Sequence, residues 1–238
     1  MKKQYYIFDV DSTLLRIESL EELAKITLRD NSDAKNILDT IENITKLGME
    51  GKIPFPVSLQ KRLAVLPIKK RHIYELTGQL FHDVTPTVAN NREFIQRNRE
   101  NCYVVTGGFA DYLLPVLCSL GFRSDHIFAN SFKYDGDTVV GIDEGNDLSK
   151  EAGKVRVIET CIPQGNRMIV GDGSTDAEPR AYGVVDHFIA FTENVRRESV
   201  VGKADFVAES FDDVLGYFKE KDSLIQREAS LLRLEYSW

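Results

Sequence analysis

The sequence predicts an α/β fold in which helices cover both faces of a parallel sheet and a helical insertion follows the first strand. Three observations lead to this prediction. Short apolar runs alternate with longer helical patterns along most of the chain, several of these runs stop at glycines, and one long stretch contains helical patterns alone. Alternating strands and helices are typical of parallel sheets, because parallel neighbours need a long crossover between them.

Five apolar runs have the length and composition of buried strands. The second stops at the glycine pair 107–108 and the third stops at Gly171. The predicted strands are 5–10, 101–106, 167–170, 187–191 and a short one at 204–207. The helical patterns between them are 88–98, 110–120, 151–160 and 175–182. Together they predict a three-layer, Rossmann-like core.

The stretch from 16 to 85 interrupts this alternation. Its helical patterns are 20–28, 37–47, 57–66 and 68–80, and it offers no convincing strand. We therefore expect a core of residues 1–15 and 86–238 and a helical cap of residues 16–85. Ligands of open parallel sheets bind outside the carboxyl ends of the strands, so an insertion directly after the first strand is well placed to act as a lid.

The end of the chain, 221–238, reads as an amphipathic helix appended to the core. Its apolar residues have two possible uses. They could dock on the core or form a face for self-association, and they are Leu224, Leu231, Leu232 and Leu234.

Composition restricts the possible partners. The chain has 238 residues, 42% hydrophobic and 28% charged, as in ordinary globular proteins. A net charge of −7 does not favour binding to nucleic acid or to an anionic membrane. No stretch approaches the roughly 20 apolar residues of a membrane span. Three cysteines without a CxxC pair predict reduced, buried thiols and a cytoplasmic protein. We expect a monomer or homodimer that acts on a small molecule.

The first predicted strand runs into two aspartates, Asp9 and Asp11. Aspartate is depleted in strands because its charge resists burial without a partner, and two at i and i+2 leave a strand on the same side. They could instead be turn residues that cap the next helix. A calcium-binding loop does not fit, because Leu14 and Leu20 stand where such a loop needs glycine and glutamate.

A second acidic site follows the third predicted strand. Asp172 and Asp176 lie in the sequence GDGSTD, whose glycines let the backbone approach closely. If two acidic strand ends lie side by side in a parallel sheet, their oxygens form a site for a hard cation.

These motifs resemble those of the haloacid dehalogenase superfamily of phosphohydrolases. Four motifs match in order, namely DVDST at 9–13, Thr106, Lys154 and GDGSTD at 171–176. The resemblance covers nearly the whole chain. It implies a magnesium-dependent phosphatase for small phosphomonoesters.

The resemblance implies that Asp9 is the nucleophile and carries an aspartyl-phosphate. Asp11 would protonate the leaving alcohol and then deprotonate the attacking water. Mg²⁺ would be held by Asp9, the backbone carbonyl of Asp11, and Asp172, with Asp176 supporting these ligands from behind. Independently, a carboxylate and a phosphate dianion repel each other, so positive charge is needed before the two can approach.

The resemblance further implies that Thr106 and the N–H of Gly107 hold the phosphoryl oxygens and that Lys154 neutralises the charge of the nucleophile and the phosphate. Thr106 could also simply end its strand. Lys150 lies four residues before Lys154 and would share a helix face with it, so one of the two lysines would be an ordinary surface residue.

The insertion resembles that of the phosphoserine phosphatases. In that family a Glu, a Met, a Phe and an Arg form the serine pocket, and they match Glu18, Met49, Phe55 and Arg62 here. The resemblance implies that Glu18 pairs with the substrate ammonium and that Arg62 binds its carboxylate. Each could also be structural: the two charged residues solvated on helices, the two apolar ones in the core.

Two positions depart from the pattern of many relatives. Thr175, which we expect among the substrate-binding residues, stands where many carry Asn, and the segment 191–194 lacks a glycine pair that some show. Other functions stay open. They are a phosphatase or phosphotransferase for another small phosphomonoester, and a non-catalytic phosphate or Mg²⁺ binder, although the latter has no need of Asp11.

Overall fold

The computed structural model describes residues 3–235, and the side chains of residues 3–223. A six-stranded parallel sheet in the order β3-β2-β1-β6-β7-β8 forms its centre. The strands are β1 (Gln4–Phe8), β2 (Cys102–Phe109), β3 (Ile127–Asn130), β6 (Asn166–Gly171), β7 (His187–Phe191) and β8 (Phe206–Ala208). The predicted α/β fold with a parallel sheet is confirmed.

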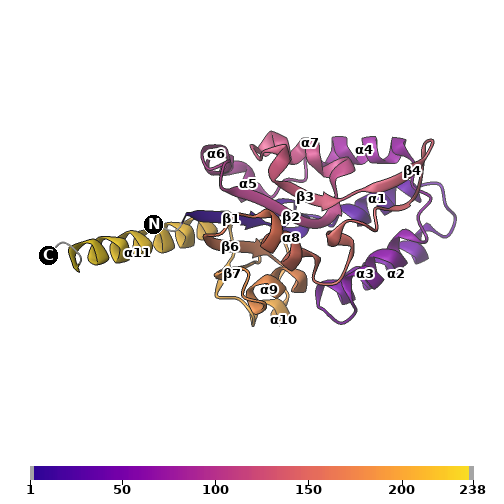
Figure 1. Ribbon diagram of the computed structural model, residues 1–238. Coiled ribbons are helices and arrows are strands. Elements are labelled where there is room, and N and C mark those ends of the chain that lie inside the picture. The colour runs from indigo at the N-terminus through magenta and orange to yellow at the C-terminus, as the bar shows by residue number, and fades with distance from the viewer. Residues whose placement is uncertain (1–2, 236–238) are drawn as a thin grey trace.

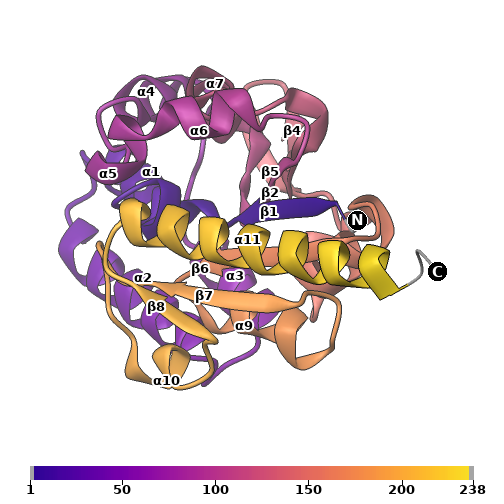
Figure 2. The same ribbon diagram turned by 90° about the vertical axis from the view of Figure 1, so that its left-hand side faces the viewer.

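Side chains of β1 alternate between two apolar layers. Tyr6 and Phe8 face one layer, and Tyr5 and Ile7 face the other. Figure 2 shows α6 and α7 on one side of the sheet and α9 on the other. The helices outside the insertion are α5 (Pro86–Asn90), α6 (Arg92–Arg97), α7 (Ala110–Leu120), α8 (Gly153–Cys161), α9 (Ser174–Ala181), α10 (Glu198–Val201) and α11 (Phe211–Glu235).

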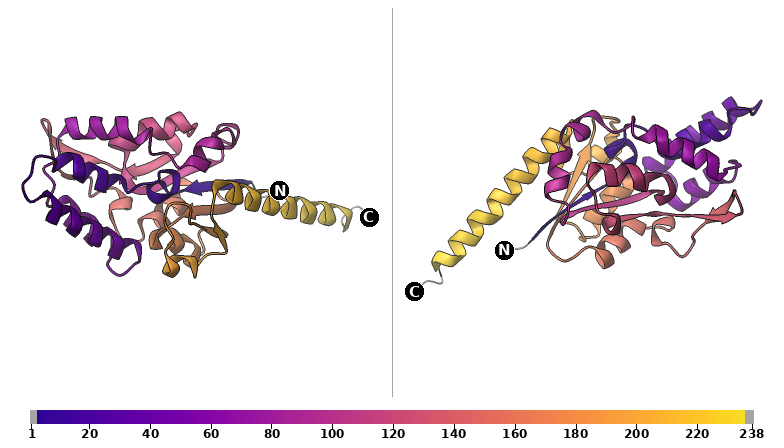
Figure 3. Two further views of the ribbon diagram at one scale, coloured as in Figure 1. Left: turned by 180° about the vertical axis from the view of Figure 1, so that it is seen from behind. Right: turned by 90° about the horizontal axis from the view of Figure 1, so that it is seen from above.

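Residues 16–85, all of them described, contain helices and no strand of either sheet. These helices lie beyond the carboxyl ends of the strands, opposite the end from which α11 projects (Figure 1, Figure 3). They are α1 (Ser19–Thr27), α2 (Ala34–Met49), α3 (Phe55–Leu63) and α4 (Lys70–Leu80). The two connections run antiparallel, with Leu15 bridged to Val84 and the Arg16 N–H donating to the Asp83 carbonyl at 2.9 Å.

Strand β3, itself not predicted from the sequence, is followed by a hairpin that was not predicted either. Its strands are β4 (Phe132–Asp135) and β5 (Thr138–Ile142). It hydrogen-bonds to the insertion: the Lys70 N–H donates to the Asp137 carbonyl at 2.9 Å, and the Val139 N–H donates to the Ile68 carbonyl at 3.0 Å. The hairpin therefore joins the core to the insertion by backbone pairing as well as by side chains.

Two helix predictions need correction. The single helix expected at 88–98 is two helices, because Asn91 leaves helical geometry and donates its side-chain amide to the Thr87 carbonyl. The last helix begins at Phe211, ten residues before the predicted 221, because Phe211 and Phe218 pack against Phe8.

The prediction of buried thiols is wrong for two of the three free cysteines. Only Cys102, on a central strand, is buried; Cys118 and Cys161 lie on helices and are exposed. The four leucines predicted to dock on the core or to form a self-association face lie outside the side chains that the structure describes; they are Leu224, Leu231, Leu232 and Leu234. In the part of the chain that is described, no helix combines the length and apolarity needed to cross a membrane.

Candidate active site

Three buried carboxylates meet where β1 and β6 end. Asp9 directly follows β1, Asp172 directly follows β6, and Asp176 lies in the first turn of α9. One oxygen of each lies within 4.8 Å of the others. The two strands are hydrogen-bonded neighbours, with Phe8 opposite Val170, and this pairing brings the acids together.

Lys154 enters this group from α8. Its Nζ lies 2.7 Å from Asp9 Oδ1 and 2.6 Å from Asp176 Oδ1. Burial lowers the pKa of the ammonium, but the charges of Asp176 and Asp9 outweigh burial and raise it above its ordinary value. Lys150, by contrast, is exposed and pairs with Asp147 at 3.5 Å. Of the two candidate lysines, the structure brings only Lys154 to the carboxylates.

The turn before Lys154 is tight. Ala152 has a φ of 51°, in the left-handed region that costs a non-glycine residue about 1 kcal/mol. A side chain at Gly153 would place its Cβ 2.9 Å from Leu148 Cα. This strained and crowded turn directly precedes Lys154 and places its ammonium in the site.

The carboxyl of Asp11 is not one of the three that could share an ion. Its Oδ1 accepts a hydrogen bond from the Ser19 N–H at 3.0 Å. Burial raises the pKa of Asp11 to about 8, and the charges of Glu18 and Asp9 act in the same direction. A carboxyl that keeps its proton near neutral pH is suited to protonating a leaving group.

Thr106 and Gly107 lie near the end of β2, beside β1. Thr106 is buried, and its Oγ1 accepts a hydrogen bond from the Gly108 N–H at 3.0 Å. A Cβ on Gly107 would lie 2.5 Å from Cζ of Phe55, so only glycine leaves room for this ring of the insertion. The residue type here is set by close approach between core and insertion.

A family model described as haloacid dehalogenase-like hydrolase matches residues 6–178. The chain belongs to the haloacid dehalogenase-like hydrolases. Among relatives of this hydrolase, the human protein named phosphoserine phosphatase is 30% identical over 217 residues, which are 90% of this chain and 92% of the human one.

Solved structures share the fold of this hydrolase. A phosphoserine phosphohydrolase-like protein from Francisella tularensis superimposes with a TM-score of 0.82 at 28% identity, covering 90% of this chain and 99% of that one. A phospho-aspartyl intermediate analogue of phosphoserine phosphatase gives a TM-score of 0.73 at 26% identity, covering 91% of this chain and 99% of that one. The predicted family and fold are confirmed.

An inner cavity of about 20 Å³ lies between the core of the hydrolase and its insertion. This volume holds about one water molecule, so the insertion is closed over the site. Most of the sequence-predicted site residues line it. They are Asp9, Asp11, Met49, Phe55, Arg62, Thr106, Gly107, Lys154 and Thr175.

Glu18 is the one predicted pocket residue that does not line the inner cavity. Its Oε1 accepts a hydrogen bond from Ser12 Oγ at 2.8 Å and lies 3.3 Å from Arg197 Nη2. Arg197 also pairs with the Asp172 carboxylate, so one guanidinium bridges two acids of the site. Arg197 was not predicted from the sequence, because it lies in a loop without a periodic pattern; its only signal was its position after β7, which ends at the same edge of the sheet.

The loop that follows β7 also supports the first acidic motif. The side-chain amide of Asn194 donates to the Ser12 carbonyl at 3.1 Å and to Thr85 Oγ1 at 2.7 Å. Ser12 itself has a φ of 53°, so Asn194 holds a strained turn in place. The missing glycine pair at 191–194 therefore leaves this loop anchored, and Asn194 is a second residue that the sequence analysis overlooked.

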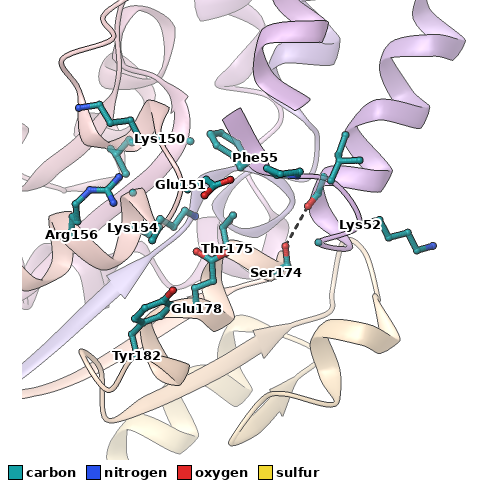
Figure 4. A pocket seen from close by; sticks show the side chains of 18 residues that line it. Lys52, Phe55, Lys150, Glu151, Lys154, Arg156, Ser174, Thr175, Glu178 and Tyr182 are labelled. Carbon is teal, nitrogen blue, oxygen red and sulfur yellow. Dashed lines mark hydrogen bonds between the residues drawn. The ribbon is translucent and has the colours of Figure 1, made fainter. Parts of the chain in front are cut away.

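An outer pocket of about 620 Å³ adjoins the inner cavity and shares Phe55, Gly107, Lys154 and Thr175 with it. Figure 4 shows Phe55 on the insertion side of this pocket and Lys154 and Thr175 on the core side. These four residues thus form the wall that the outer pocket and the inner cavity share.

The donor set of the hydrolase fits a hard divalent cation. Asp9, Asp172 and Asp176 offer three buried carboxylate oxygens within reach of one ion, and oxygen ligands of this kind suit Mg²⁺ or Ca²⁺. Thr13 Oγ1 donates to Asp172 Oδ1 at 3.0 Å and orients one of them. No histidine or cysteine belongs to this cluster, which argues against a softer metal.

Proposed function

We propose that this hydrolase converts O-phosphoserine to serine and phosphate, with Mg²⁺ as cofactor and with an aspartyl-phosphate on Asp9. One observation carries the proposal: the inner cavity is lined at once by Asp9, Thr106 and Lys154, which suit a phosphoryl group, and by the buried guanidinium of Arg62, which suits a carboxylate. The human relative and the phospho-aspartyl analogue support the same reaction.

In the first half-reaction a carboxylate oxygen of Asp9 bonds to phosphorus while the bond from phosphorus to the serine oxygen breaks. Asp11 gives its proton to that oxygen, and serine leaves. In the second half-reaction Asp11 takes a proton from water as the water oxygen bonds to phosphorus, and the bond to Asp9 breaks. Phosphate leaves and both aspartates return to their starting states.

Positioning of charge supplies most of the catalysis in phosphoryl transfer. Lys154, 2.7 Å from Asp9, would lower the repulsion between nucleophile and phosphate, and Thr106 with the Gly107 N–H would hold the phosphoryl oxygens. When bound, Mg²⁺ adds positive charge at the same place. We propose that Asp9, the backbone carbonyl of Asp11, and Asp172 hold the ion, with Asp176 behind them.

The amino-acid part of the substrate needs one anion and one cation as partners. Arg62 is 4% exposed, and its Nε donates to the Ser58 carbonyl at 3.3 Å, which fixes the stem of the guanidinium. Glu18 would receive the ammonium in exchange for Arg197. Met49 and Phe55 would exclude water from the reacting atoms, and Thr175 would complete the wall.

A phosphate-release assay tests the proposal. With Mg²⁺ we expect kcat/KM for O-phosphoserine to exceed that for phosphoethanolamine, which lacks the carboxylate, by at least about a hundredfold, the effect of an unpaired buried polar site. Arg62→Ala should remove this preference and leave turnover of p-nitrophenyl phosphate in place. EDTA should abolish release, and Mg²⁺ should restore it. Equal rates on both amino-alcohol esters would reject phosphoserine as the substrate.

The chain then belongs to serine biosynthesis, and we place it in the cytoplasm. We also propose that residues 16–85 act as a cap on a core of residues 1–15 and 86–238. The inner cavity is too small for phosphoserine, so a substrate enters only when these residues move away from the core.

A further inference from the structure

Tyr112 is a phenol at the wall of the inner cavity that none of the four sequence motifs includes. It lies in the first turn of α7, is fully buried, and lines the cavity together with Asp11 and Arg62. Its ring lies 6.0 Å from the ring of Phe109 and 6.3 Å from that of Phe132, centroid to centroid. A tyrosine held this firmly presents its hydroxyl at one fixed place.

The hydroxyl oxygen of Tyr112 already accepts one hydrogen bond. The donor is Oγ of Ser19, in the first turn of α1, at 3.1 Å from Tyr112 Oη. Among the hydrogen bonds of the described residues, none has the Tyr112 O–H as donor. A buried hydroxyl carries one proton to donate, and leaving it without an acceptor is costly. The site therefore has a donor waiting for a partner.

Asp11 also lines the cavity, but among the described residues no hydrogen bond joins it to Tyr112, and Asp11 Oδ1 already has a donor. It accepts the backbone N–H of Ser19 at 3.0 Å. Ser19 thus contacts both residues: its N–H donates to Asp11 Oδ1 and its hydroxyl donates to Tyr112 Oη. Burial raises the pKa of Asp11, and hydrogen bonds from the side chain and backbone of Ser19 oppose that rise. The Tyr112 proton is left for a group that enters the cavity.

Arg62 also has a hydrogen-bond donor without a partner among the described residues. Its Nε donates to the Ser58 carbonyl at 3.3 Å and its Nη1 to Thr45 Oγ1 at 3.4 Å, while Nη2 has no hydrogen-bond partner among the described residues. Two donors, Nη2 of Arg62 and the O–H of Tyr112, therefore line one cavity that also contains the proposed nucleophile. A ligand group that takes both must accept two hydrogen bonds, and a carboxylate does so with two oxygens and with a charge opposite to that of the guanidinium.

We propose that Tyr112 is a specificity-determining residue whose hydroxyl binds the carboxylate of the substrate beside Arg62. This inference rests on the proposed function, because it assigns the second donor to the carboxylate of an amino-acid phosphoester. The ring of Tyr112 closes the cavity behind that carboxylate. Ser19 sets the direction of the hydroxyl.

The test compares Tyr112→Phe with the wild-type enzyme on O-phosphoserine and phosphoethanolamine, with Mg²⁺ present. We expect the ratio of the two kcat/KM values to fall about tenfold or more, the effect of one hydrogen bond to a charged group. The change should lie in KM for phosphoserine. Tyr134→Phe is the matched control, since it removes a hydroxyl that donates to Asp111 Oδ1 at 2.6 Å outside the cavity, and it should keep the wild-type ratio.

The outcomes separate the two proposals. A wild-type enzyme that prefers phosphoserine together with an unchanged ratio in Tyr112→Phe overturns the role of Tyr112 and leaves the proposed function intact. A wild-type enzyme without that preference overturns both. An equal loss on both substrates, with a shifted pH profile of kcat, would show that Tyr112 acts on Asp11 and would reject the inference.

A second variant guards against a folding defect. Ser19→Ala removes the hydroxyl that orients Tyr112 and keeps the backbone N–H that orients Asp11. We expect the same ratio to fall severalfold, less than in Tyr112→Phe, with thermal midpoints measured for every variant. A Ser19→Ala enzyme with the wild-type ratio contradicts the proposed orientation of the hydroxyl and with it the inference.

Discussion

Replacing Lys154 by methionine keeps an unbranched side chain that is one atom shorter and removes the charge. In the metal-free protein we expect the free energy of unfolding to fall by about 3–5 kcal/mol, the cost of leaving buried charges without their partner. Two contacts set this magnitude, at 2.7 Å to Asp9 and 2.6 Å to Asp176. Each is worth about 6 kcal/mol of attraction at an effective dielectric constant of about 20, and much of that attraction offsets the cost of burial.

The loss of stability in Lys154→Met should grow as pH rises. Burial and the charge of Asp9 raise the pKa of Asp176 to about 7, and Lys154 opposes them. Without Lys154 the pKa therefore moves higher. A carboxyl whose pKa is raised by folding destabilises the fold as pH rises from the unfolded value to the folded one. The folded pKa of Asp176 is higher in the variant, so this pH range reaches further up. The difference in free energy of unfolding between the wild type and Lys154→Met should therefore be larger at about pH 8.5 than at about pH 6.

Urea unfolding in the presence of EDTA, followed by circular dichroism, measures both effects. Lys150→Met is the control: its ammonium is exposed and 3.5 Å from Asp147, so its loss should cost less than about 1 kcal/mol. A Lys154→Met protein that loses no more than the control would refute the reasoning. So would a deficit that shrinks as pH rises.

Three further changes test other parts of the site. Asp9→Asn should lower kcat at least about 10⁴-fold, and acid-quenched protein should carry no phosphate; label retained by this variant would contradict the nucleophile. Arg197→Gln removes the guanidinium that pairs with Asp172. Mg²⁺ should therefore bind about tenfold more tightly in calorimetry, the value of one charge-assisted hydrogen bond. Weaker Mg²⁺ binding would contradict competition between the Arg197 guanidinium and Mg²⁺ for this carboxylate. Gly107→Ala puts a methyl 2.5 Å from Phe55 Cζ, so kcat/KM should fall about tenfold as the ring is displaced; unchanged kinetics would exclude a role for this contact.

Much of the central sheet could be predicted from the sequence. The strand 187–191 was predicted with its observed bounds. Because the sheet is parallel, the strands that stop just before Asp9 and Asp172 bring both acids to the same edge, and the pairing of β1 with β6 makes them neighbours. These predictions worked because buried parallel strands are uninterrupted apolar runs that stop abruptly at acids and glycines. The same convergence explains why the site acids could be found without an alignment.

The hairpin β4–β5 and the arginine at 197 could not be found this way. Lys133 and Asp135 are exposed and interrupt the apolar pattern of β4, so it resembled a loop. Arg197 contacts Asp172 and Glu18 only because separate segments fold together, and no local pattern encodes that meeting. The pairing of Glu18 with an internal cation was likewise invisible, although the residue itself was predicted.

Two segments far apart in the chain, 16–85 and 132–142, share the backbone hydrogen bonds that Lys70 and Val139 donate. A chimera with the helices of a relative and the hairpin of this chain would have to form these hydrogen bonds between segments from two different proteins. Recombination between relatives should therefore succeed most often when both segments come from the same parent, although a long stretch of sheet and helix separates them in the chain.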